Sequence, residues 1–285
     1  MIIDTHTHFY DPSRPQGVPW PRPSEAWLYR PVLPAHYRAL AAPIGITGTV
    51  VVEASAWVED NQWLLDLARK DRFLLGIVGN LDPRHESFPD NLGRFAADPL
   101  FRGIRCGAGT FGQGPDGLVV ERLGLLAERG LTLDAHVGAG HLAAVAELAR
   151  RLPSLRIVVN HLALPPVDGG PPPADWRRAV ELVAAQPGVF MKVSAFEEFS
   201  RTQPAPTDAA HYTPVFDAVW EAFGPERLLY GSNWPCSDRS GTLASTLAVV
   251  KDYVSQRGPA AAAAVLAANA CRAYGVAVRP AAAGA

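Results

Sequence analysis

The feature of this chain that most constrains its fold is the alternation of short apolar runs with stretches of helical periodicity. Each run is rich in apolar or β-branched residues and is bounded by turn-forming residues, as expected of a β-strand. The clearest helix lies at 141–152, because Leu142, Val145 and Leu148 share one face. The predicted strands cover residues 1–9, 48–55, 73–81, 101–107, 131–137, 156–162, 188–196 and 227–233. About eight strand and helix units indicate an α/β chain folded as a (β/α)8, or TIM, barrel.

We expect one domain over residues 1–276 and a frayed tail over 277–285. The alternative is a doubly wound open sheet, which shows the same alternation. The first predicted strand is not followed by G-x-G-x-x-G, and G-x-x-x-x-G-K-[ST] does not occur in the sequence. Polar residues recur at the carboxyl ends of most predicted strands, where the loops of a barrel converge, so the barrel is favoured.

Composition and charge narrow the class of function. Among 285 residues, 48% are hydrophobic and 19% are charged, which is typical of a globular protein with a large core. The formal net charge of -2 provides no basic surface for nucleic acid and no polybasic patch for a membrane. We therefore expect a small-molecule substrate; the oligomeric state stays open.

The N-terminus and the cysteines indicate a cytoplasmic protein. The first residues lack the basic and apolar regions of a signal peptide, and no apolar run is long enough to span a bilayer. The three cysteines are odd in number and widely spaced, which argues against a disulfide framework and favours a reducing compartment.

Two proline-rich stretches, at 12–34 and 165–173, interrupt the alternation and predict loop insertions at the barrel mouth. We interpret the first as an ordered flap that carries Trp20, Trp27 and Tyr29 over the mouth. Surface connections without a ligand role are the alternative for both stretches.

The sequence "DTHTH" ends the first predicted strand and is the most informative motif. Side chains at alternate positions of a strand share a face, so Asp4, His6 and His8 point the same way. Two imidazoles spaced in this manner can turn toward one metal ion or one substrate.

Several motifs resemble the amidohydrolase-related family of the amidohydrolase superfamily, near its fuconolactonase and pyrone-dicarboxylate lactonase branch. The resemblance covers the chain from Ile3 to about Val276 and implies a distorted (β/α)8 barrel with its site at the carboxyl-terminal mouth. The motifs that carry it are "IDTHTHFYDP", "FRGIR", "NHLALP", "MKVSAF", "LLYGSNWP" and "NACRAYGV".

The resemblance also implies a set of site residues. In metal-dependent members, one divalent ion, zinc or manganese, is held by positions that match His6, His8 and His136 and by a strand-eight aspartate, while a position matching His161 assists catalysis. This chain carries Asn233 where the aspartate is expected. A neutral amide supplies neither the negative charge nor the basicity of a carboxylate. Some lactonases of the family are thought to use histidines and an arginine without a metal, so the ion is left open.

Loss of the aspartate leaves the general base to be found among other residues. His161 is the first candidate, because the unperturbed pKa of histidine lies near the working pH, and Glu53 at the end of the second strand is the next. Asp238 lies just beyond the strand-eight turn and is a further option. Asn233 itself is retained as a catalytic candidate.

Substrate-binding candidates lie near the ends of other strands. Arg105 and Lys192 would bind a substrate carboxylate or an oxyanion, although each could instead pair with a buried carboxylate. Ser194 shares a strand face with Lys192 and is a hydrogen-bonding candidate. Trp20 and Tyr212, on two predicted loops, complete the set.

These observations favour a hydrolase that opens a lactone or related cyclic ester of a sugar acid or aromatic-catabolism intermediate, by attack of water at the carbonyl. A metal-dependent decarboxylase or other carbon–carbon cleaving enzyme of the same family is the first alternative. A barrel that binds a small molecule without turnover is the second. No G-x-S-x-G motif occurs, which disfavours a serine nucleophile of that kind.

Overall fold

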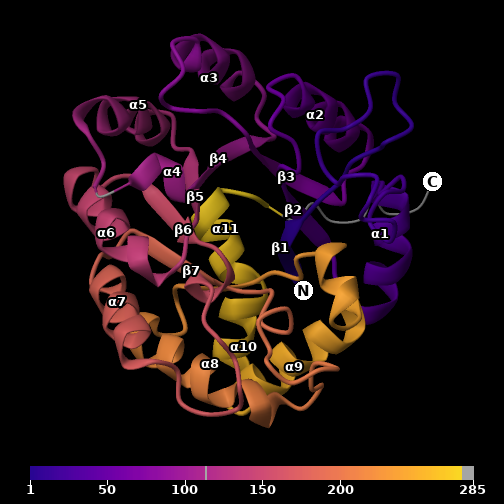
Figure 1. The fold of residues 1–285 in the computed structure, drawn as a ribbon, viewed down its shortest axis with the longest axis vertical. Helices are drawn as coiled ribbons and strands as arrows, with labels where there is room; N and C mark the ends of the chain where they lie inside the picture. The colour runs from indigo at the N-terminus through magenta and orange to yellow at the C-terminus, as the bar shows by residue number, and fades with distance from the viewer. Residues whose placement is uncertain (113, 278–285) are drawn as a thin grey trace.

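The computed structural model describes residues 1–112 and 114–277. Its centre is an eight-stranded parallel sheet whose strands pair in chain order, and a bridge between Thr7 and Trp234 joins the last strand region to the first. Figure 1 shows the helices arranged around these strands. The strands are β1 (Ile3–Thr7), β2 (Gly48–Val52), β3 (Leu74–Gly79), β4 (Phe101–Gly107), β5 (Thr132–His136), β6 (Arg156–Val159), β7 (Val189–Val193) and β8 (Leu228–Tyr230). The predicted (β/α)8 barrel is confirmed.

Most of the helices form an outer layer around the strands, and the last of them lies at one end of the barrel. They are α1 (Pro34–Ala41), α2 (Asp60–Lys70), α3 (Phe88–Ala96), α4 (Ala108–Phe111), α5 (Gly117–Glu128), α6 (Leu142–Arg151), α7 (Ala174–Ala184), α8 (Ala209–Phe223), α9 (Leu243–Ser255), α10 (Pro259–Ala263) and α11 (Asn269–Tyr274). Helix α6 agrees with the predicted helix, and its Leu142, Val145 and Leu148 are buried. None of the helices in residues 1–112 and 114–277 combines the length and apolarity needed to cross a bilayer.

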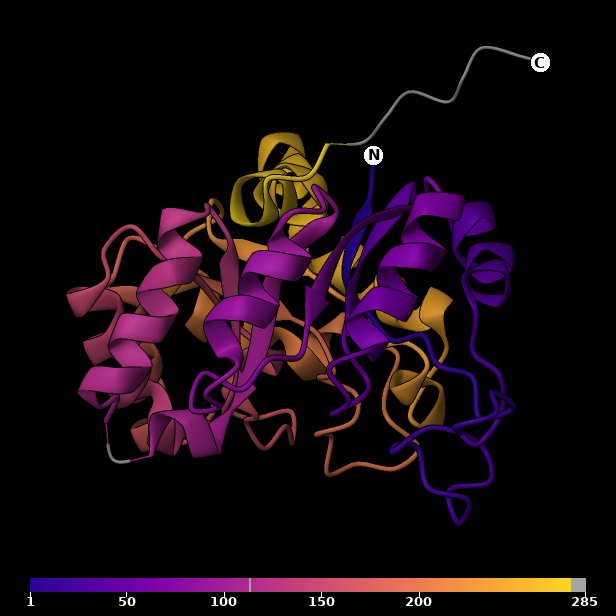
Figure 2. The same ribbon diagram turned by 90° about the horizontal axis from the view of Figure 1, so that it is seen from above.

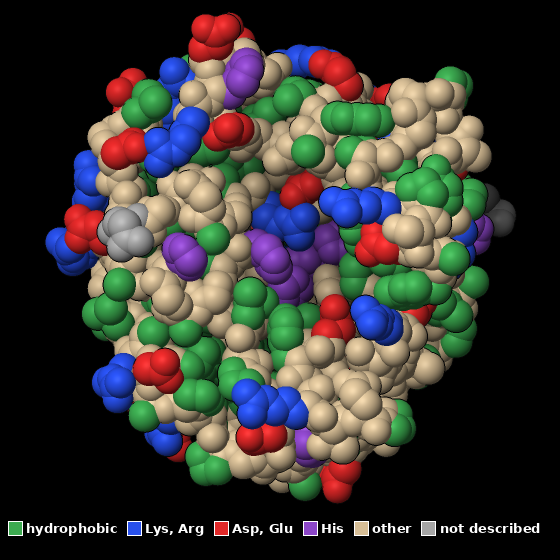
Figure 3. All heavy atoms as spheres, in the orientation of Figure 1, with side chains coloured by type: hydrophobic (Ala, Val, Ile, Leu, Met, Phe, Trp, Pro, Cys, Tyr) green, Lys and Arg blue, Asp and Glu red, His purple; other side chains and the backbone are tan. Residues whose placement is uncertain are grey.

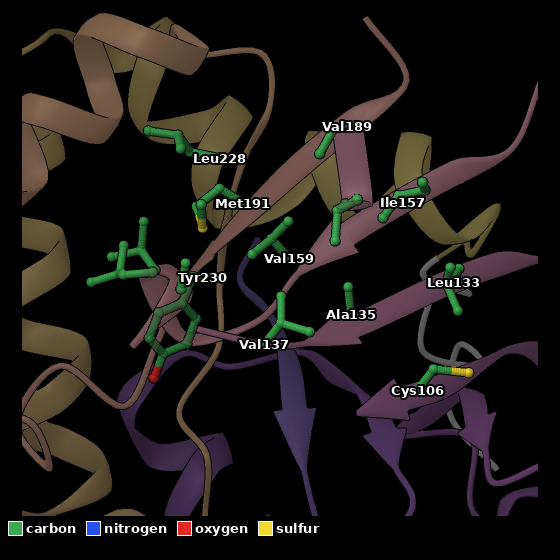
Figure 4. Packing of buried hydrophobic residues seen from close by; sticks show 14 of the residues in the cluster. Cys106, Leu133, Ala135, Val137, Ile157, Val159, Val189, Met191, Leu228 and Tyr230 are labelled. Carbon is green, nitrogen blue, oxygen red and sulfur yellow. The ribbon is translucent and has the colours of Figure 1, made fainter. Parts of the chain in front are cut away.

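Successive side chains of a strand point to opposite faces, so each strand contributes to two different cores, one outside the sheet and one inside the barrel. Outward-facing residues such as Leu133 and Ala135 of β5 pack under the helices, together with Ile157 and Val159 of β6 (Figure 4). Inward-facing residues fill the barrel and include charged groups near the mouth. This alternation decides which polar residues of each strand reach the site.

Helix α11 closes the amino-terminal end of the barrel. Its Ala270, Ala273 and Tyr274 join the inward-facing apolar residues of the strands in one buried cluster. In Figure 2 the last helices lie on the same side as the N-terminus, away from the loops at the opposite end. The barrel is therefore open to a ligand at its carboxyl-terminal mouth, as is usual for this fold.

The segment 12–33 forms an ordered loop rather than a helix or strand, which agrees with the proline-rich pattern. Arg14 anchors it through an ion pair with Asp60 at 2.9 Å and by stacking over Trp63. Trp27 and Tyr29 of this loop are 39% and 37% exposed and, unlike Trp20, do not line the cavity described below. Residues 278–285 of the predicted tail lie outside the described residues.

Candidate functional site

A cavity of about 420 Å³ lies at the carboxyl-terminal ends of the strands. Figure 3 shows it as a central hollow in which histidine side chains lie beside basic and acidic ones. Its lining combines polar groups with an apolar wall: His8, Trp20, Ala54, Arg105, His136, His161, Leu164, Ala195, Glu198, Phe199, Asn233 and Cys236. Its size and mixed lining suit a small polar molecule. Trp20, predicted to bind substrate, is part of this wall.

The two histidines of the first strand end share the inner face, as the alternation predicts, but only His8 lines the cavity. His6 is fully buried, with its ring centroid 4.4 Å from that of His161. The nearby Asp4 accepts hydrogen bonds from the Tyr37 hydroxyl at 2.6 Å and the Ser232 amide at 2.8 Å. The Asp4 carboxylate therefore joins β1 to the end of β8 and fixes the histidine pair.

Lys192 does not reach the cavity. Its ammonium donates to Asp134 Oδ2 at 2.6 Å, and both side chains are fully buried. Asp134 also accepts from the Tyr274 hydroxyl and the Asn160 amide, which is the pattern of an ionised carboxylate. Burial lowers the pKa of Lys192, and the Asp134 charge opposes that shift. The predicted substrate-binding role of Lys192 is thus replaced by the alternative, a buried ion pair inside the barrel.

Lys192 also sets the proton position on His6. Its Nζ lies 3.2 Å from His6 Nδ1, and an ammonium can only donate, so Nδ1 is the acceptor. Burial lowers the pKa of His6 well below its usual value, so the ring is neutral and its single proton lies on Nε2. His6 Nε2 is buried and has no hydrogen-bond partner among the residues that the structure describes.

His161 lines the cavity and is held by Ser194, whose Oγ lies 2.8 Å from Nδ1. Ser194 was predicted to bind substrate. It is fully buried and instead forms its hydrogen bond with the His161 imidazole. The backbone from His161 to Leu164 has φ between 54° and 57°, a left-handed conformation that is costly for residues with a Cβ. Burial lowers the pKa of His161 well below its usual value, so the ring is neutral near pH 7.

His136, at the end of β5, also lines the cavity, as its strand position predicts. Its ring centroid is 5.3 Å from that of His161, in an edge-to-face arrangement. Burial lowers the pKa of His136 to about 4 and that of His8 to about 3, and the Arg105 charge acts in the same direction. The cavity therefore presents neutral imidazoles to a ligand at neutral pH.

Arg105 is the cation of the cavity wall. Its Nε donates to Glu53 Oε1 at 2.7 Å and its Nη2 donates to the Glu53 carbonyl at 3.0 Å. The carboxylate of Glu53 is thus paired with Arg105 and does not line the cavity. This position does not suit the predicted role of Glu53 as general base. The pairing also fixes the guanidinium in one orientation, which suits recognition of a carbonyl or carboxylate oxygen.

Asn233 lies between His8 and an acidic residue that the sequence argument missed. Its Oδ1 is 3.2 Å from His8 Nε2, and its Nδ2 donates to Glu198 Oε1 at 2.6 Å. The backbone of Asn233 has a φ of 61°, a conformation that asparagine tolerates better than most residues. Burial raises the pKa of Glu198 to about 7, although the Asn233 hydrogen bond opposes the shift. The sequence offered one indication of Glu198, because the two glutamates of "SAFEEFS" follow directly after the end of a strand.

Two other predicted participants lie away from the cavity. Tyr212 is fully buried in α8, where its ring packs edge-to-face on Phe196 and its hydroxyl donates to the Pro206 carbonyl. The prediction that it binds substrate is wrong, because this part of the chain is helical and its Tyr212 face turns into the core. Asp238 forms an ion pair with Arg30 at 3.8 Å and is absent from the cavity lining.

The histidine set can be tested for its fit to the single metal ion that the resemblance implies. A ligand nitrogen must offer a lone pair, and the one on His6 Nδ1 is taken by Lys192. Across residues 1–112 and 114–277, no three His, Cys, Asp or Glu side chains are grouped so as to hold an ion. The arrangement described therefore does not fit a three-histidine metal site. Binding would require His6 to lose its Nε2 proton or to separate from Lys192.

Comparison with known proteins identifies the family. The chain is 34% identical over 279 residues to an L-fucono-1,5-lactonase of Burkholderia ambifaria, covering 95% of this chain and 94% of that protein. It is 26% identical to an L-fucono-1,5-lactonase of Burkholderia multivorans, with coverages of 92% and 91%.

Solved structures show the same fold. An amidohydrolase of Burkholderia multivorans described with bound zinc has a TM-score of 0.84 at 24% identity, over 97% of this chain and 100% of that one. The amidohydrolase family model matches residues 3–276. Nearly the whole chain is thus covered by one family model and by a relative above 30% identity, and the protein belongs to the amidohydrolase family.

Proposed function

We propose that this protein hydrolyses the lactone of a sugar acid. The observation that carries the proposal is a cavity in which a fixed arginine, Arg105, and a neutral imidazole, His161, line the same space. Similarity over nearly the full chain to a protein that acts on L-fucono-1,5-lactone supports a lactone of a sugar acid as the substrate class.

The chemistry follows from the two groups. The Arg105 guanidinium binds the lactone carbonyl oxygen and stabilises the negative charge that develops there when water attacks. His161 accepts the proton of the attacking water at Nε2, which has a free lone pair in the tautomer whose Nδ1–H donates to Ser194 Oγ. The carbon–oxygen bond of the ring then breaks, and the leaving ring oxygen takes the proton that His161 received from water, which gives a hydroxy acid and restores the neutral imidazole.

The remaining groups hold these two in place. The Glu53 carboxylate fixes Arg105, and the Ser194 hydroxyl orients the His161 ring. The apolar part of the wall, which includes Trp20, Leu164 and Phe199, contacts the carbon skeleton and limits access of water.

A zinc ion is described in the Burkholderia multivorans structure, and the predicted zinc or manganese ion of this chain stays a prediction. Because the arrangement of His6 described above does not fit such an ion, no step of the proposed hydrolysis uses one. Elemental analysis of protein purified without chelator measures the metal content directly.

A panel of aldonolactones and pyrone lactones, followed by acid release with a pH indicator, tests the proposed activity. We expect turnover of sugar-acid lactones, and His161→Gln should lower kcat/KM by about 10²- to 10⁴-fold because the proton acceptor is lost. His85→Gln, at an exposed histidine outside the cavity, is the matched control and should keep the parent rate. Absence of turnover for every lactone in the panel would refute the proposal.

A further inference from the structure

A second cavity, of about 490 Å³, lies at the end of the barrel opposite the mouth. Its walls come from the last turn of α2, the first residues of β3 and β4, and the chain directly after α11. Figure 2 shows this end of the molecule beside the N-terminus, away from the loops of the mouth. The proposed hydrolysis takes place at the mouth and gives this cavity no role.

The charges that line this second cavity do not balance. Three arginines, Arg69, Arg72 and Arg102, face a single carboxylate, that of Asp98. Both oxygens of Asp98 are engaged, because Oδ2 pairs with Arg69 at 2.6 Å and Oδ1 accepts from the Leu100 amide at 2.8 Å. Within residues 1–112 and 114–277, neither Arg72 nor Arg102 forms an ion pair. Two of the three guanidinium groups therefore lack a carboxylate partner in this part of the chain.

The side chain of Arg102 is built into the wall of the cavity. A Cβ at Gly76 of β3 would lie 2.5 Å from Arg102 Cγ, so the glycine leaves the room that the arginine stem occupies. Arg102 Nε is buried and has no hydrogen-bond partner among the described residues. A buried donor without an acceptor destabilises the folded protein, and a ligand that supplies the acceptor would remove that cost.

A further arginine adds to the positive charge at this end of the barrel. Arg156, at the start of β6, donates to the Ala273 carbonyl at 2.7 Å and to the Gly130 carbonyl, and these acceptors carry no net charge. Burial lowers the pKa of Arg102, the Arg156 charge acts in the same direction, and the Asp98 charge opposes it. Arginine stays protonated at neutral pH, so these groups leave an excess of positive charge beside the cavity.

The remaining wall of the cavity is apolar. Leu74 and Leu75 at the start of β3 are buried, and Pro99 and Leu100 precede β4. The volume exceeds what an inorganic phosphate ion fills, so an anion attached to an apolar body suits the cavity better. A guanidinium binds phosphate through two parallel hydrogen bonds, and a phosphate monoester carries close to two negative charges at neutral pH.

We propose that this cavity binds a small phosphomonoester, with its phosphate group on Arg72 and Arg102 and its organic part against the leucines of β3. The phosphate supplies the acceptor that Arg102 Nε lacks and the negative charge that the two guanidinium groups lack. A dianion matches two cations better than a single carboxylate does. This site is independent of the proposed lactone hydrolysis, because it lies at the other end of the barrel.

Isothermal titration calorimetry of the full-length protein with phenyl phosphate, at an ionic strength held constant with sodium chloride, tests the site. We expect saturable binding, and weaker binding of inorganic phosphate, which cannot contact the apolar wall. Phenol has the ring without the charge and should not bind. Arg102→Met should weaken the binding of phenyl phosphate by about 10- to 100-fold, because charge-assisted hydrogen bonds are lost.

Three variants locate the binding, each first shown to be folded by circular dichroism. Arg72→Met removes the second cation at an exposed position outside the core and should also weaken binding. Arg94→Met is the matched control, because Arg94 is exposed, pairs with Glu59 and lies outside the cavity, and it should bind like the wild type. Arg105→Met removes the cation of the mouth and should keep the binding that depends on Arg102.

Two results would overturn the proposal. One is a wild-type protein that gives no saturable heat with phenyl phosphate, including one that sediments with phosphatidic acid vesicles and so binds a lipid headgroup instead. The other is binding that survives in Arg102→Met and Arg72→Met and disappears in Arg105→Met, which would place the phosphate at the mouth.

Discussion

The ion pair of Lys192 and Asp134 offers a quantitative test of how the barrel interior is built. Both side chains are fully buried and their charged atoms are 2.6 Å apart. Lys192→Met removes the cation and leaves Asp134 with the neutral donors Tyr274 and Asn160. Removing one partner of a buried pair leaves an uncompensated charge, so we expect the free energy of unfolding to fall by about 3–5 kcal/mol.

Urea denaturation followed by tryptophan fluorescence measures this change. The double variant Lys192→Met/Asp134→Asn should regain most of the loss, because no isolated charge remains in it. Arg94→Met breaks an ion pair with Glu59 whose side chains are 45% and 70% exposed, and it should cost less than about 1 kcal/mol. A Lys192→Met protein that loses no more than the Arg94→Met control would refute the reasoning about the buried pair.

Three further outcomes follow from the site. Ser194→Ala should lower kcat about tenfold with little change in KM, because the substitution frees the His161 ring without removing it; an unchanged kcat would contradict this. Arg105→Lys should lower kcat/KM by about 10²-fold, since an ammonium cannot both pair with Glu53 and bind an oxyanion as a guanidinium does; steady-state kinetics on the preferred lactone would measure it. The contribution of His8 and His136 to the free energy of unfolding should be complete above about pH 6.5 and should fall below it by about 1.4 kcal/mol per pH unit for each ring. The reason is that these histidines bind protons in the unfolded chain near pH 6.5, whereas burial lowers the pKa of His8 to about 3 and that of His136 to about 4 in the folded protein. Urea titrations between pH 7 and pH 5 would show a flat profile if these rings were protonated in the folded state.

Sequence periodicity was sufficient to predict the barrel, since each predicted apolar run contains one observed strand. It also placed His8, Arg105, His136, His161 and Asn233 at the strand ends that line the cavity. These predictions succeed because alternation along a strand and the convergence of strand ends at one mouth are consequences of local geometry.

The sequence could not establish which charged groups pair inside the barrel. Lys192 and Asp134 lie on β7 and β5, and their contact depends on the curvature of the closed sheet rather than on spacing along the chain. The same limit applies to Glu198, which reaches Asn233 from a loop whose path is set by tertiary packing. Tyr212 was misplaced because the segment expected to be a loop is a helix from Ala209 onward.

Hydrolysis of a sugar-acid lactone in water enriched in oxygen-18 tests the central claim most directly. If water attacks the carbonyl in the cavity beside Arg105 and His161, mass spectrometry should find one labelled oxygen in the product carboxylate and none in the released hydroxyl group. His161→Gln should form this product at a rate lower by about 10²- to 10⁴-fold. Label in the hydroxyl group, or no enzyme-dependent product from any sugar-acid lactone, would contradict the account.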